Sequence, residues 1–133
     1  MKDSFYLNMA LGVADHSKCK RMKVGAVLVK DDDIIGTGYN GPPRKHEPDV
    51  CECQKTGETL EHVIHAEVNA ILCAGRNGRS TEGTTLYLTL SPCSRCAALI
   101  VQAGVRRVVF LKEYRHSCGL DLLSEHGITT EQY

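Results

Sequence analysis

The chain has 133 residues, and its 16 lysine and arginine residues balance 16 aspartate and glutamate residues, so the formal net charge is zero. This length fits one domain over residues 1–133, and a hydrophobic fraction of 42% is typical of a globular chain and argues against disorder. The neutral charge balance argues against a stable nucleic acid partner held by bulk charge. No apolar run reaches the roughly 18 to 20 residues of a membrane helix and no long apolar segment opens the chain, so we expect no membrane contact and a cytoplasmic location.

The first half of the chain predicts a helix, a hairpin and a long loop. Apolar residues recur at helical spacing from Ser4 to Ser17, with Ser4 as the expected N-cap. Two β-rich runs at 24–29 and 34–38 flank three consecutive aspartates, which predicts a hairpin. Residues 40–60 show no sustained period, so we expect a loop that is functional or tied down.

Helices and strands alternate in the rest of the chain. The predicted elements are a helix at 66–74 ended by Gly75, a strand at 84–89, a helix at 97–103 stopped by Gly104, a strand at 107–111, and a weaker helix at about 119–126 before a short tail. A hairpin followed by strands that alternate with helices predicts a three-layer α/β domain with a mixed sheet.

Seven cysteines and six histidines need an explanation in a chain of this size. An odd number of cysteines in a reducing compartment argues against a disulfide framework, so metal ligation is the better hypothesis. Two cysteines are expected to have no metal: Cys73 on the apolar face of a helix should be buried, and Cys118 should be a free thiol.

Two predicted helix starts carry residues at metal-ligand spacing. Cys93 and Cys96 are three residues apart, so they share one face of a first helical turn, where the helix N-terminus favours thiolates. His65, at the start of the preceding helix, would supply a third ligand. One imidazole and two thiolates match Zn²⁺ with a fourth position open to water, which is typical of a catalytic site. Taken alone, Cys-x-x-Cys also fits a redox pair or half of a structural zinc site.

Glu67 is the informative neighbour of these residues. Two positions along a helix rotate a side chain by about 200°, so Glu67 and His65 can converge only beyond the N-terminal tip of the helix. A carboxylate near zinc that is not needed as a ligand can take a proton from water and deliver it elsewhere. His-x-Glu and Pro-Cys-x-x-Cys together form the signature of zinc-dependent base deaminases.

Five stretches of the chain resemble the cytidine deaminase-like superfamily, and within it the deoxycytidylate (dCMP) deaminases of bacteria and phages. They are Lys23–Val27, Gly38–Gly41, Ile64–Ile71, Leu90–Cys93 and Glu113–Arg115. The zinc motifs are shared by the superfamily, whereas Gly-Tyr-Asn-Gly and Glu-Tyr-Arg point to dCMP. The resemblance implies an α/β/α fold with a mixed sheet of about five strands. For a phage-encoded member it implies a location in the host cytoplasm.

The resemblance also assigns the chemistry. His65, Cys93 and Cys96 would bind the catalytic zinc, and an activated water would attack C4 of cytosine. Glu67 would shuttle protons to N3 and to the leaving amine. The products would be ammonia and dUMP, and the dUMP would supply thymidylate synthesis.

Further residues are assigned to the substrate by the same resemblance. Asn40 would contact the deoxyribose and Tyr114 the nucleotide. The Ala66 backbone N–H would hold the C2 carbonyl, and the backbone around Ser91 would accept from the exocyclic amine. Candidates for the 5′-phosphate are Lys20, Arg21, Lys23, Arg44, Lys45 and Arg115. An alternative interpretation makes Asn40 a turn residue and Tyr114 an ordinary edge aromatic.

Relatives of this type also imply a second metal and an assembly. They often hold the long loop with a structural zinc, for which the candidates are Cys19, Cys51, Cys53 and either His62 or His46. They are commonly hexamers activated by dCTP and inhibited by dTTP, and such a triphosphate effector would bring Mg²⁺. Arg76 and Asn77 resemble a subunit-contact or allosteric segment, although an arginine at a helix C-terminus needs no such role.

Two other functions compete with this one. A deaminase of the same fold could act on cytidine, guanine or adenosine in tRNA, although the zero net charge argues against tRNA. From another class, a non-catalytic zinc module could bind nucleotide or DNA. Glu67 distinguishes the two classes, because a structural zinc site takes four protein ligands and needs no free carboxylate.

Overall fold

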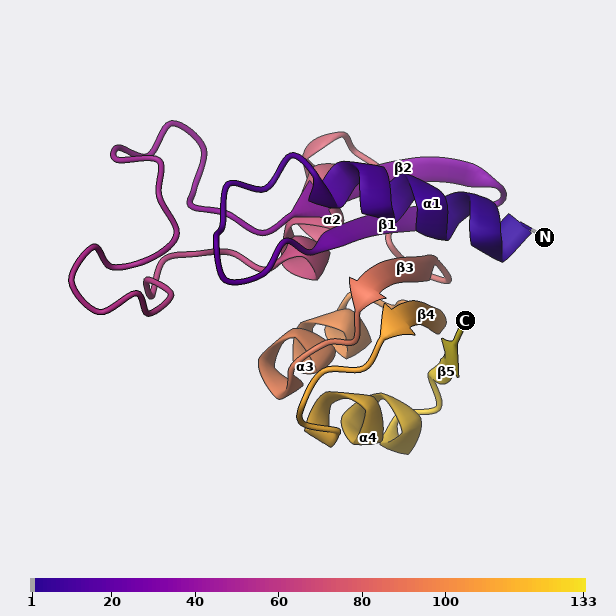
Figure 1. Cartoon of the computed structure of the whole chain (residues 1–133). Coiled ribbons are helices and arrows are strands. Elements are labelled where there is room, and N and C mark those ends of the chain that lie inside the picture. The colour runs from indigo at the N-terminus through magenta and orange to yellow at the C-terminus, as the bar shows by residue number, and fades with distance from the viewer. Residues whose placement is uncertain (1) are drawn as a thin grey trace.

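The computed structural model describes residues 2–133, which form four helices and five strands (Figure 1). In chain order these are α1 (Lys2–Ala14), β1 (Gly25–Lys30), β2 (Asp33–Tyr39), α2 (Ala66–Arg76), β3 (Thr85–Leu90), α3 (Ser94–Gln102), β4 (Arg107–Lys112), α4 (Cys118–Glu125) and β5 (Thr129–Gln132). The strands form one mixed sheet in the order β2-β1-β3-β4-β5. β1 pairs antiparallel with β2 and β3, whereas β3, β4 and β5 are parallel. Within residues 2–133, no helix has both the length and the apolar character that crossing a bilayer requires.

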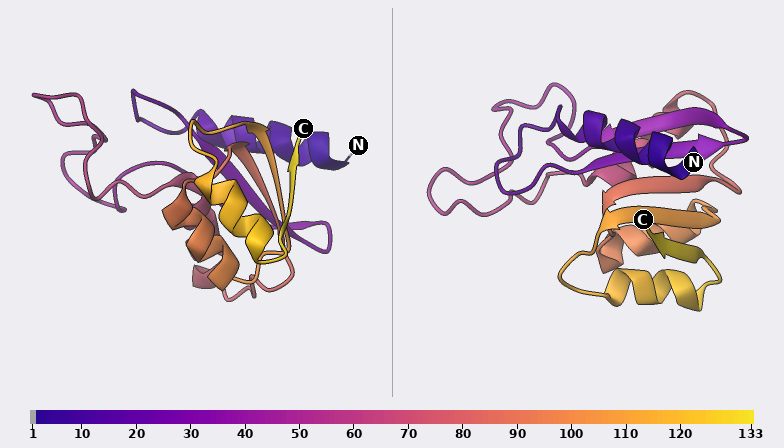
Figure 2. Two further views of the ribbon diagram at one scale, coloured as in Figure 1. Left: turned by 90° about the horizontal axis from the view of Figure 1, so that it is seen from below. Right: turned by 45° about the vertical axis from the view of Figure 1, so that its right-hand side comes forward.

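Helices cover both faces of the sheet, which confirms the predicted three-layer α/β fold (Figure 2). On one face, α1 packs Leu7 and Ala10 against Val27 and its neighbours. On the other face, α2, α3 and α4 cover the alternate strand residues. Almost every residue of β1 is therefore buried, as the unbroken apolar run at 24–29 indicates for a strand covered on both sides.

Helix α2 lies directly on the backbone of β2, and this contact positions the candidate site. Gly36 and Gly38 face the helix, and a Cβ at Gly38 would overlap the Ala66 carbonyl and the Ala70 amide. Ala66, Ala70 and Ala74 recur on the same face of α2 and are fully buried. Small residues on both elements allow the close approach, which fixes where the N-terminus of α2 lies relative to the sheet.

Three elements differ from the sequence prediction. Helix α1 begins at Lys2 and ends at Ala14, so Ser4 lies within the helix instead of capping it. Helix α3 begins at Ser94, earlier than predicted, because Cys93 in extended backbone is its N-cap. β5 forms where a short tail is predicted: Thr129–Gln132 has no apolar pattern, and backbone pairing with β4 holds the strand.

Residues 40–65 form the long loop between β2 and α2, which projects from one end of the molecule (Figure 1). Two isolated bridges hold it, between Gly41 and Ile64 and between Glu52 and Thr59. A disulfide also joins Cys51 in the loop to Cys19 before β1, and both residues are buried. The sequence argues against a disulfide framework and assigns Cys19 and Cys51 to a metal, and for this pair the disulfide shows that assignment to be wrong. The path of the loop brings the two residues together across 32 positions, which local spacing does not reveal.

Candidate metal centre and substrate cavity

The N-termini of α2 and α3 converge beside the sheet and bring together the three predicted zinc ligands. His65 and Cys93 are the N-caps of the two helices, and Cys96 lies in the first turn of α3. The His65 Nδ1 atom lies 3.2 Å from Cys96 Sγ and 3.7 Å from Cys93 Sγ. Neither N-cap side chain makes a capping hydrogen bond to its own helix, so both are available as ligands. All three ligand atoms lie within 4.8 Å of one another.

Hydrogen bonds couple the titration of Cys93, Cys96 and His65. Hydrogen bonds from the Cys96 thiol and from His65 lower the pKa of Cys93 to about 3, so this residue is a thiolate. The contact with Cys93 in turn raises the pKa of Cys96 and that of His65. The two helix N-termini add partial positive charge beside the thiolate. The cluster is therefore an anionic acceptor suited to a cation.

A zinc ion fits this set of donors. Two thiolates would neutralise its two positive charges, and His65 completes the three protein ligands that a catalytic site takes. Because metal-bound cysteines are deprotonated, binding of the cation would displace the thiol proton of Cys96. His65 and Cys93 also line the neighbouring cavity, so a bound ion would be reachable from it.

Glu67 lies in the first turn of α2, is 4% exposed and lines the same cavity. Desolvation raises the pKa of Glu67 to about 7, although its backbone N–H and the positive charge of His65 act in the opposite direction. A carboxyl group whose pKa is near neutrality can both accept and donate a proton. His65 at the N-cap and Glu67 just inside the helix both line this cavity at the N-terminal tip of α2.

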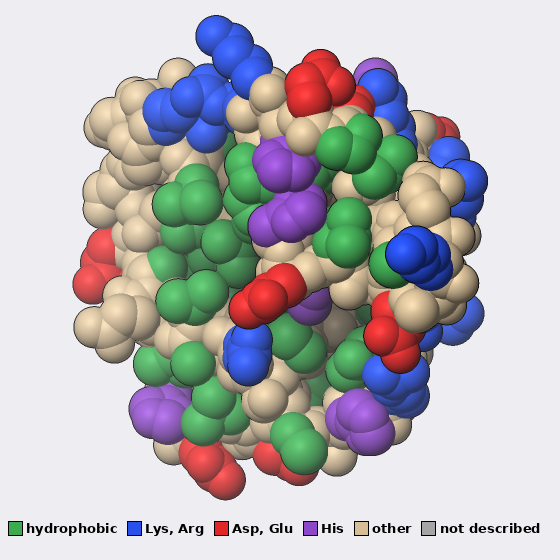
Figure 3. Space-filling model, turned by 90° about the vertical axis from the view of Figure 1, so that its left-hand side faces the viewer, with side chains coloured by type: hydrophobic (Ala, Val, Ile, Leu, Met, Phe, Trp, Pro, Cys, Tyr) green, Lys and Arg blue, Asp and Glu red, His purple; other side chains and the backbone are tan. Residues whose placement is uncertain are grey.

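A cavity of about 460 Å³ adjoins the metal cluster. All five residues predicted to contact substrate line it: Asn40, Ala66, Ser91, Tyr114 and Arg115. Figure 3 views the end of the molecule from which the long loop projects, where hydrophobic side chains occupy the middle of the face and lysine and arginine side chains gather mainly towards the rim. The volume of this cavity lies within the range of small-molecule sites in proteins.

Part of the predicted phosphate-binding set lies at this cavity. Arg21 and Arg115 line it, together with Lys112, which sequence analysis missed. The other candidates lie elsewhere: Lys20 and Lys23 are outside its lining, and Arg44 and Lys45 line a different cavity. Lys112 resembles an ordinary surface lysine at a strand end. Only its register opposite Leu90 in the parallel pair of β3 and β4 places it at the site.

Asn40 has a structural role in the cavity wall. Its side-chain carbonyl accepts the Val24 backbone N–H at 2.9 Å, and its side-chain nitrogen donates to the Met22 carbonyl at 2.8 Å. Both ends of the amide therefore hold the segment before β1. The predicted contact with deoxyribose would come from a side chain that the protein already fixes on both sides.

The predicted second zinc site is not assembled. Cys19 and Cys51 are joined in the disulfide, and Cys53 is a free thiol. The ring of His62 packs instead against a second histidine, with 4.2 Å between ring centres. The side chain that does approach the disulfide is Glu52, which no spacing rule indicates. The four predicted ligands therefore do not converge on one ion.

A second cavity of about 630 Å³ lies next to the first, and Asn40 lines both. Its charged lining comprises Lys18, Arg44, Lys45 and Arg76 together with Glu47 and Asp49. Arg76, predicted to contact a subunit or effector, therefore lies at a hollow with several cations. Asn77 ends α2, where its side-chain nitrogen donates to the Cys73 carbonyl at 2.8 Å. Cys73 is half-buried instead of buried, and Cys118 is an exposed free thiol, as predicted.

Comparison with known proteins gives a consistent result. Residues 1–112 match the family model described as the cytidine and deoxycytidylate deaminase zinc-binding region. The deoxycytidylate deaminase of Enterobacteria phage T4 is 38% identical in an alignment of 156 positions, and this alignment covers 86% of this chain and 79% of the relative. That of Mycobacterium phage D29 is 40% identical over 124 residues, covering 84% of this chain and 94% of the relative. The crystal structure of dCMP deaminase from cyanophage S-TIM5, in complex with dCMP and dUMP, has a TM-score of 0.94 at 38% identity and covers 98% of this chain and 95% of its own.

Proposed function

Since the chain belongs to the cytidine and deoxycytidylate deaminase family, we propose that it hydrolyses dCMP to dUMP and ammonia. The observation that carries this proposal is Glu67, a buried carboxyl group with a raised pKa beside a cluster of three zinc ligands. A structural zinc site would take four protein ligands and would need no such carboxyl group. The crystal structure that this chain resembles contains dCMP and dUMP, which supports a pyrimidine nucleotide as the substrate.

In the proposed reaction, water adds to C4 of the cytosine base and the bond from C4 to the amino nitrogen breaks. Zinc, when bound at the cluster, supplies the Lewis acidity that makes water a nucleophile at neutral pH. Glu67 transfers one proton of the water to N3 and the other to the leaving amine, so ammonia departs and a carbonyl remains at C4. A pKa of about 7 suits Glu67 to both directions of transfer.

The base is proposed to bind between the N-terminus of α2 and the connection that follows β3. The backbone N–H of Ala66, in the first turn of α2, has no partner within the helix and would donate to the C2 carbonyl. The Ser91 carbonyl would accept from the exocyclic amine. Asn40 would contact the deoxyribose and Tyr114 the nucleotide, and the fact that all four residues line one cavity supports this arrangement.

The cations at the cavity support a phosphorylated substrate. Arg21 before β1, and Lys112 and Arg115 at and after the end of β4, line the same hollow as Glu67. A 5′-phosphate bound there would make charge-assisted hydrogen bonds, which are stronger than neutral ones. The proposal therefore expects dCMP to be preferred over deoxycytidine.

We further propose that the active form is a homo-oligomer, with a hexamer favoured. This enzyme would be activated by dCTP with its Mg²⁺ and inhibited by dTTP. The cations of the second cavity, Arg76 among them, support a triphosphate effector there. The dUMP produced would supply thymidylate synthesis in the cytoplasm, or in the host cytoplasm for a phage-encoded enzyme.

A parallel assay of zinc-loaded protein with dCMP, deoxycytidine, CMP and dCTP tests the proposal, with ammonia release and the ultraviolet change as readouts. We expect turnover of dCMP above that of the other three. Glu67→Gln should abolish turnover and retain zinc. Equal turnover of deoxycytidine would identify a nucleoside deaminase, and no turnover of any of the four would favour another base or a non-catalytic zinc module. Full turnover by Glu67→Gln would overturn the mechanism.

A further inference from the structure

The connections that leave β3 and β4 are joined by a side chain that has no part in the proposed chemistry. The Ser91 hydroxyl accepts a hydrogen bond from the Tyr114 backbone N–H, with 2.7 Å between Oγ and N. The Ser91 backbone N–H donates to the Lys112 carbonyl at 2.9 Å. Ser91 is 2% exposed. These two bonds extend the parallel pairing of β3 and β4 beyond the ends of both strands.

The segment that Ser91 holds carries side chains expected to meet the nucleotide. Residues 113–117 connect β4 to α4, and Tyr114 and Arg115 in this segment line the cavity. The Arg115 guanidinium carbon lies 5.6 Å from the centre of the Tyr114 ring, so the two side chains form one unit. Whatever fixes the backbone at Tyr114 therefore also fixes a cation at the cavity.

The far side of the connection is held by a different contact. Gly119 in the first turn of α4 packs so closely on the Pro92 carbonyl that a Cβ at Gly119 would overlap it. The same short segment, Ser91 and Pro92, thus anchors the connection on both sides. Of these two anchors, the Ser91 hydroxyl is the one nearer to Arg115 in the chain.

We propose that the side chain of Ser91 is a positioning residue that sets the preference for a phosphorylated substrate. Its hydroxyl holds the backbone at Tyr114, and through it the Arg115 guanidinium, without contacting the reacting atoms. This inference rests on the proposed function, because the nucleotide is what Tyr114 and Arg115 would meet. It gives the Ser91 side chain a role that is separate from that of its backbone.

Removal of the hydroxyl should have a specific consequence. Without its acceptor, the Tyr114 N–H needs another partner, because an unpaired and partly buried amide is unfavourable. Water can satisfy the amide if the connection moves outwards, and Arg115 moves with it. Cys93 is fixed by α3 and stays in place, so binding of the phosphate should weaken while the chemistry at the base persists.

Thr84→Val is a matched control for Ser91→Ala. Thr84 also has a fully buried hydroxyl, which donates to the Thr81 carbonyl at 2.7 Å, but it precedes β3 at the end of the strand away from Ser91. Each variant loses one buried hydrogen bond, so a merely structural role would affect both in the same way. Ser91→Thr keeps the hydroxyl and serves as the rescue.

Steady-state kinetics on dCMP and deoxycytidine give the first test. We expect Ser91→Ala to raise KM for dCMP about five- to tenfold, and to raise KM for dCMP more than it raises KM for deoxycytidine. Thr84→Val and Ser91→Thr should keep the KM of the wild type. An unchanged KM for dCMP in Ser91→Ala, or equal rises for the two substrates, would overturn the proposal.

Hydrogen exchange gives a second test that needs no turnover. The Tyr114 amide should exchange faster in Ser91→Ala than in the wild type, and at the wild-type rate in Thr84→Val. Unaltered exchange at Tyr114 in Ser91→Ala would overturn the positioning role. Wild-type protein without activity on dCMP would instead refute the proposed function, and the exchange rates would still decide whether Ser91 holds this segment.

Discussion

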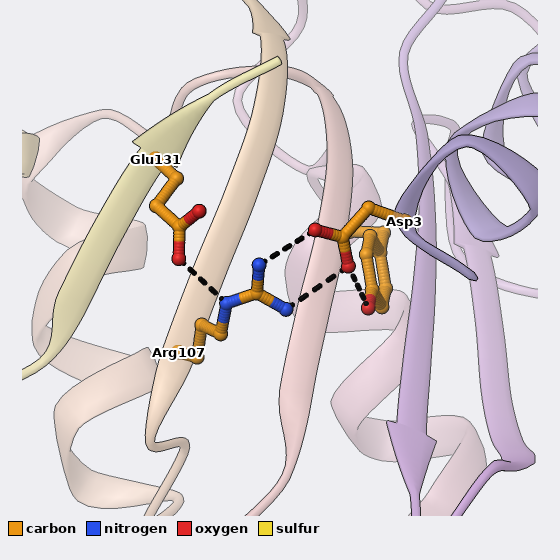
Figure 4. A network of polar contacts seen from close by, with 4 residues as sticks. Asp3, Arg107 and Glu131 are labelled. Carbon is orange, nitrogen blue, oxygen red and sulfur yellow. Dashed lines mark hydrogen bonds and ion pairs between the residues drawn. The ribbon is translucent and has the colours of Figure 1, made fainter. Parts of the chain in front are cut away.

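Asp3 and Arg107 join α1 to β4 through a bidentate ion pair between residues 104 positions apart in the chain (Figure 4). The two terminal guanidinium nitrogens lie 3.0 and 2.6 Å from the two carboxylate oxygens. Arg107 also donates from Nε to Glu131 on β5 at 2.8 Å, and the Tyr87 hydroxyl donates to Asp3 at 2.7 Å. One arginine therefore fastens the first helix and the last strand to the parallel half of the sheet.

Replacing Asp3 with asparagine should lower the free energy of unfolding by about 1 to 2 kcal/mol at pH 7, because a half-buried, charge-assisted pair is lost. Urea denaturation of wild type and variant measures this difference. Asp32→Asn is the matched control, since Asp32 pairs with Lys2 on the surface and both side chains are largely exposed. An equal loss of stability in the two variants would contradict a special role for the buried pair.

The same difference should depend on pH. The hydrogen bonds from Arg107 hold the pKa of Asp3 below its ordinary value. Because the folded state has the lower pKa, its contribution is complete above the unfolded pKa of about 3.9 and is lost as the pH falls through the folded pKa. The gap between wild type and Asp3→Asn should therefore stay constant from about pH 7 to about pH 5 and shrink once the pH falls below about 4. A gap that stays constant below about pH 4 as well would show that the carboxylate charge contributes nothing.

We expect one tightly bound zinc ion per chain, held by His65, Cys93 and Cys96. His65→Ala should lose most of this zinc because it leaves only two ligands, and metal analysis after dialysis measures the loss. His62→Ala is the control and should retain the metal, since His62 packs against another histidine away from the cluster. Two zinc ions per chain, one of them lost from His62→Ala, would show that the long loop assembles a second metal site.

Alkylation of unfolded protein without a reductant should modify five of the seven cysteines. Cys19 and Cys51 should remain joined and appear in one cross-linked peptide by mass spectrometry, because their sulfur atoms are bonded to each other. After reduction, all seven should react. Modification of Cys19 and Cys51 before reduction would contradict the disulfide.

Gly38→Ala should lower the free energy of unfolding by about 1 to 3 kcal/mol and weaken zinc binding. The added Cβ overlaps the backbone of α2 at Ala66, so the helix that carries His65 must shift. Denaturant titration and metal analysis measure the two effects. Gly12→Ala in α1 is the control: no atom lies near its Cβ, and it should stabilise the protein by about 0.5 to 1 kcal/mol. Wild-type zinc affinity in Gly38→Ala would show that the contact with β2 does not position His65.

The sequence by itself predicted most of the secondary structure and the residues of the candidate metal cluster. Both rest on spacing within a few residues, which helix and strand geometry convert directly into positions. Cys93 and Cys96 are three residues apart at the start of one helix, where Cys93 is the N-cap and Cys96 lies in the first turn. His65 and Glu67 can meet only at a helix tip, and the glycines and alternating apolar residues show where the helices and strands lie.

Only the tertiary structure decided which distant segments meet. Lys112 reaches the cavity because β3 and β4 pair in parallel, and the Ser91 hydroxyl meets Tyr114 for the same reason. Cys19 and Cys51 form a disulfide because the long loop folds back and brings them together. β5 has no apolar pattern, and it forms a strand because its backbone pairs in parallel with the edge of β4. Such contacts depend on register and chain path, and a pattern of neighbouring residues contains neither.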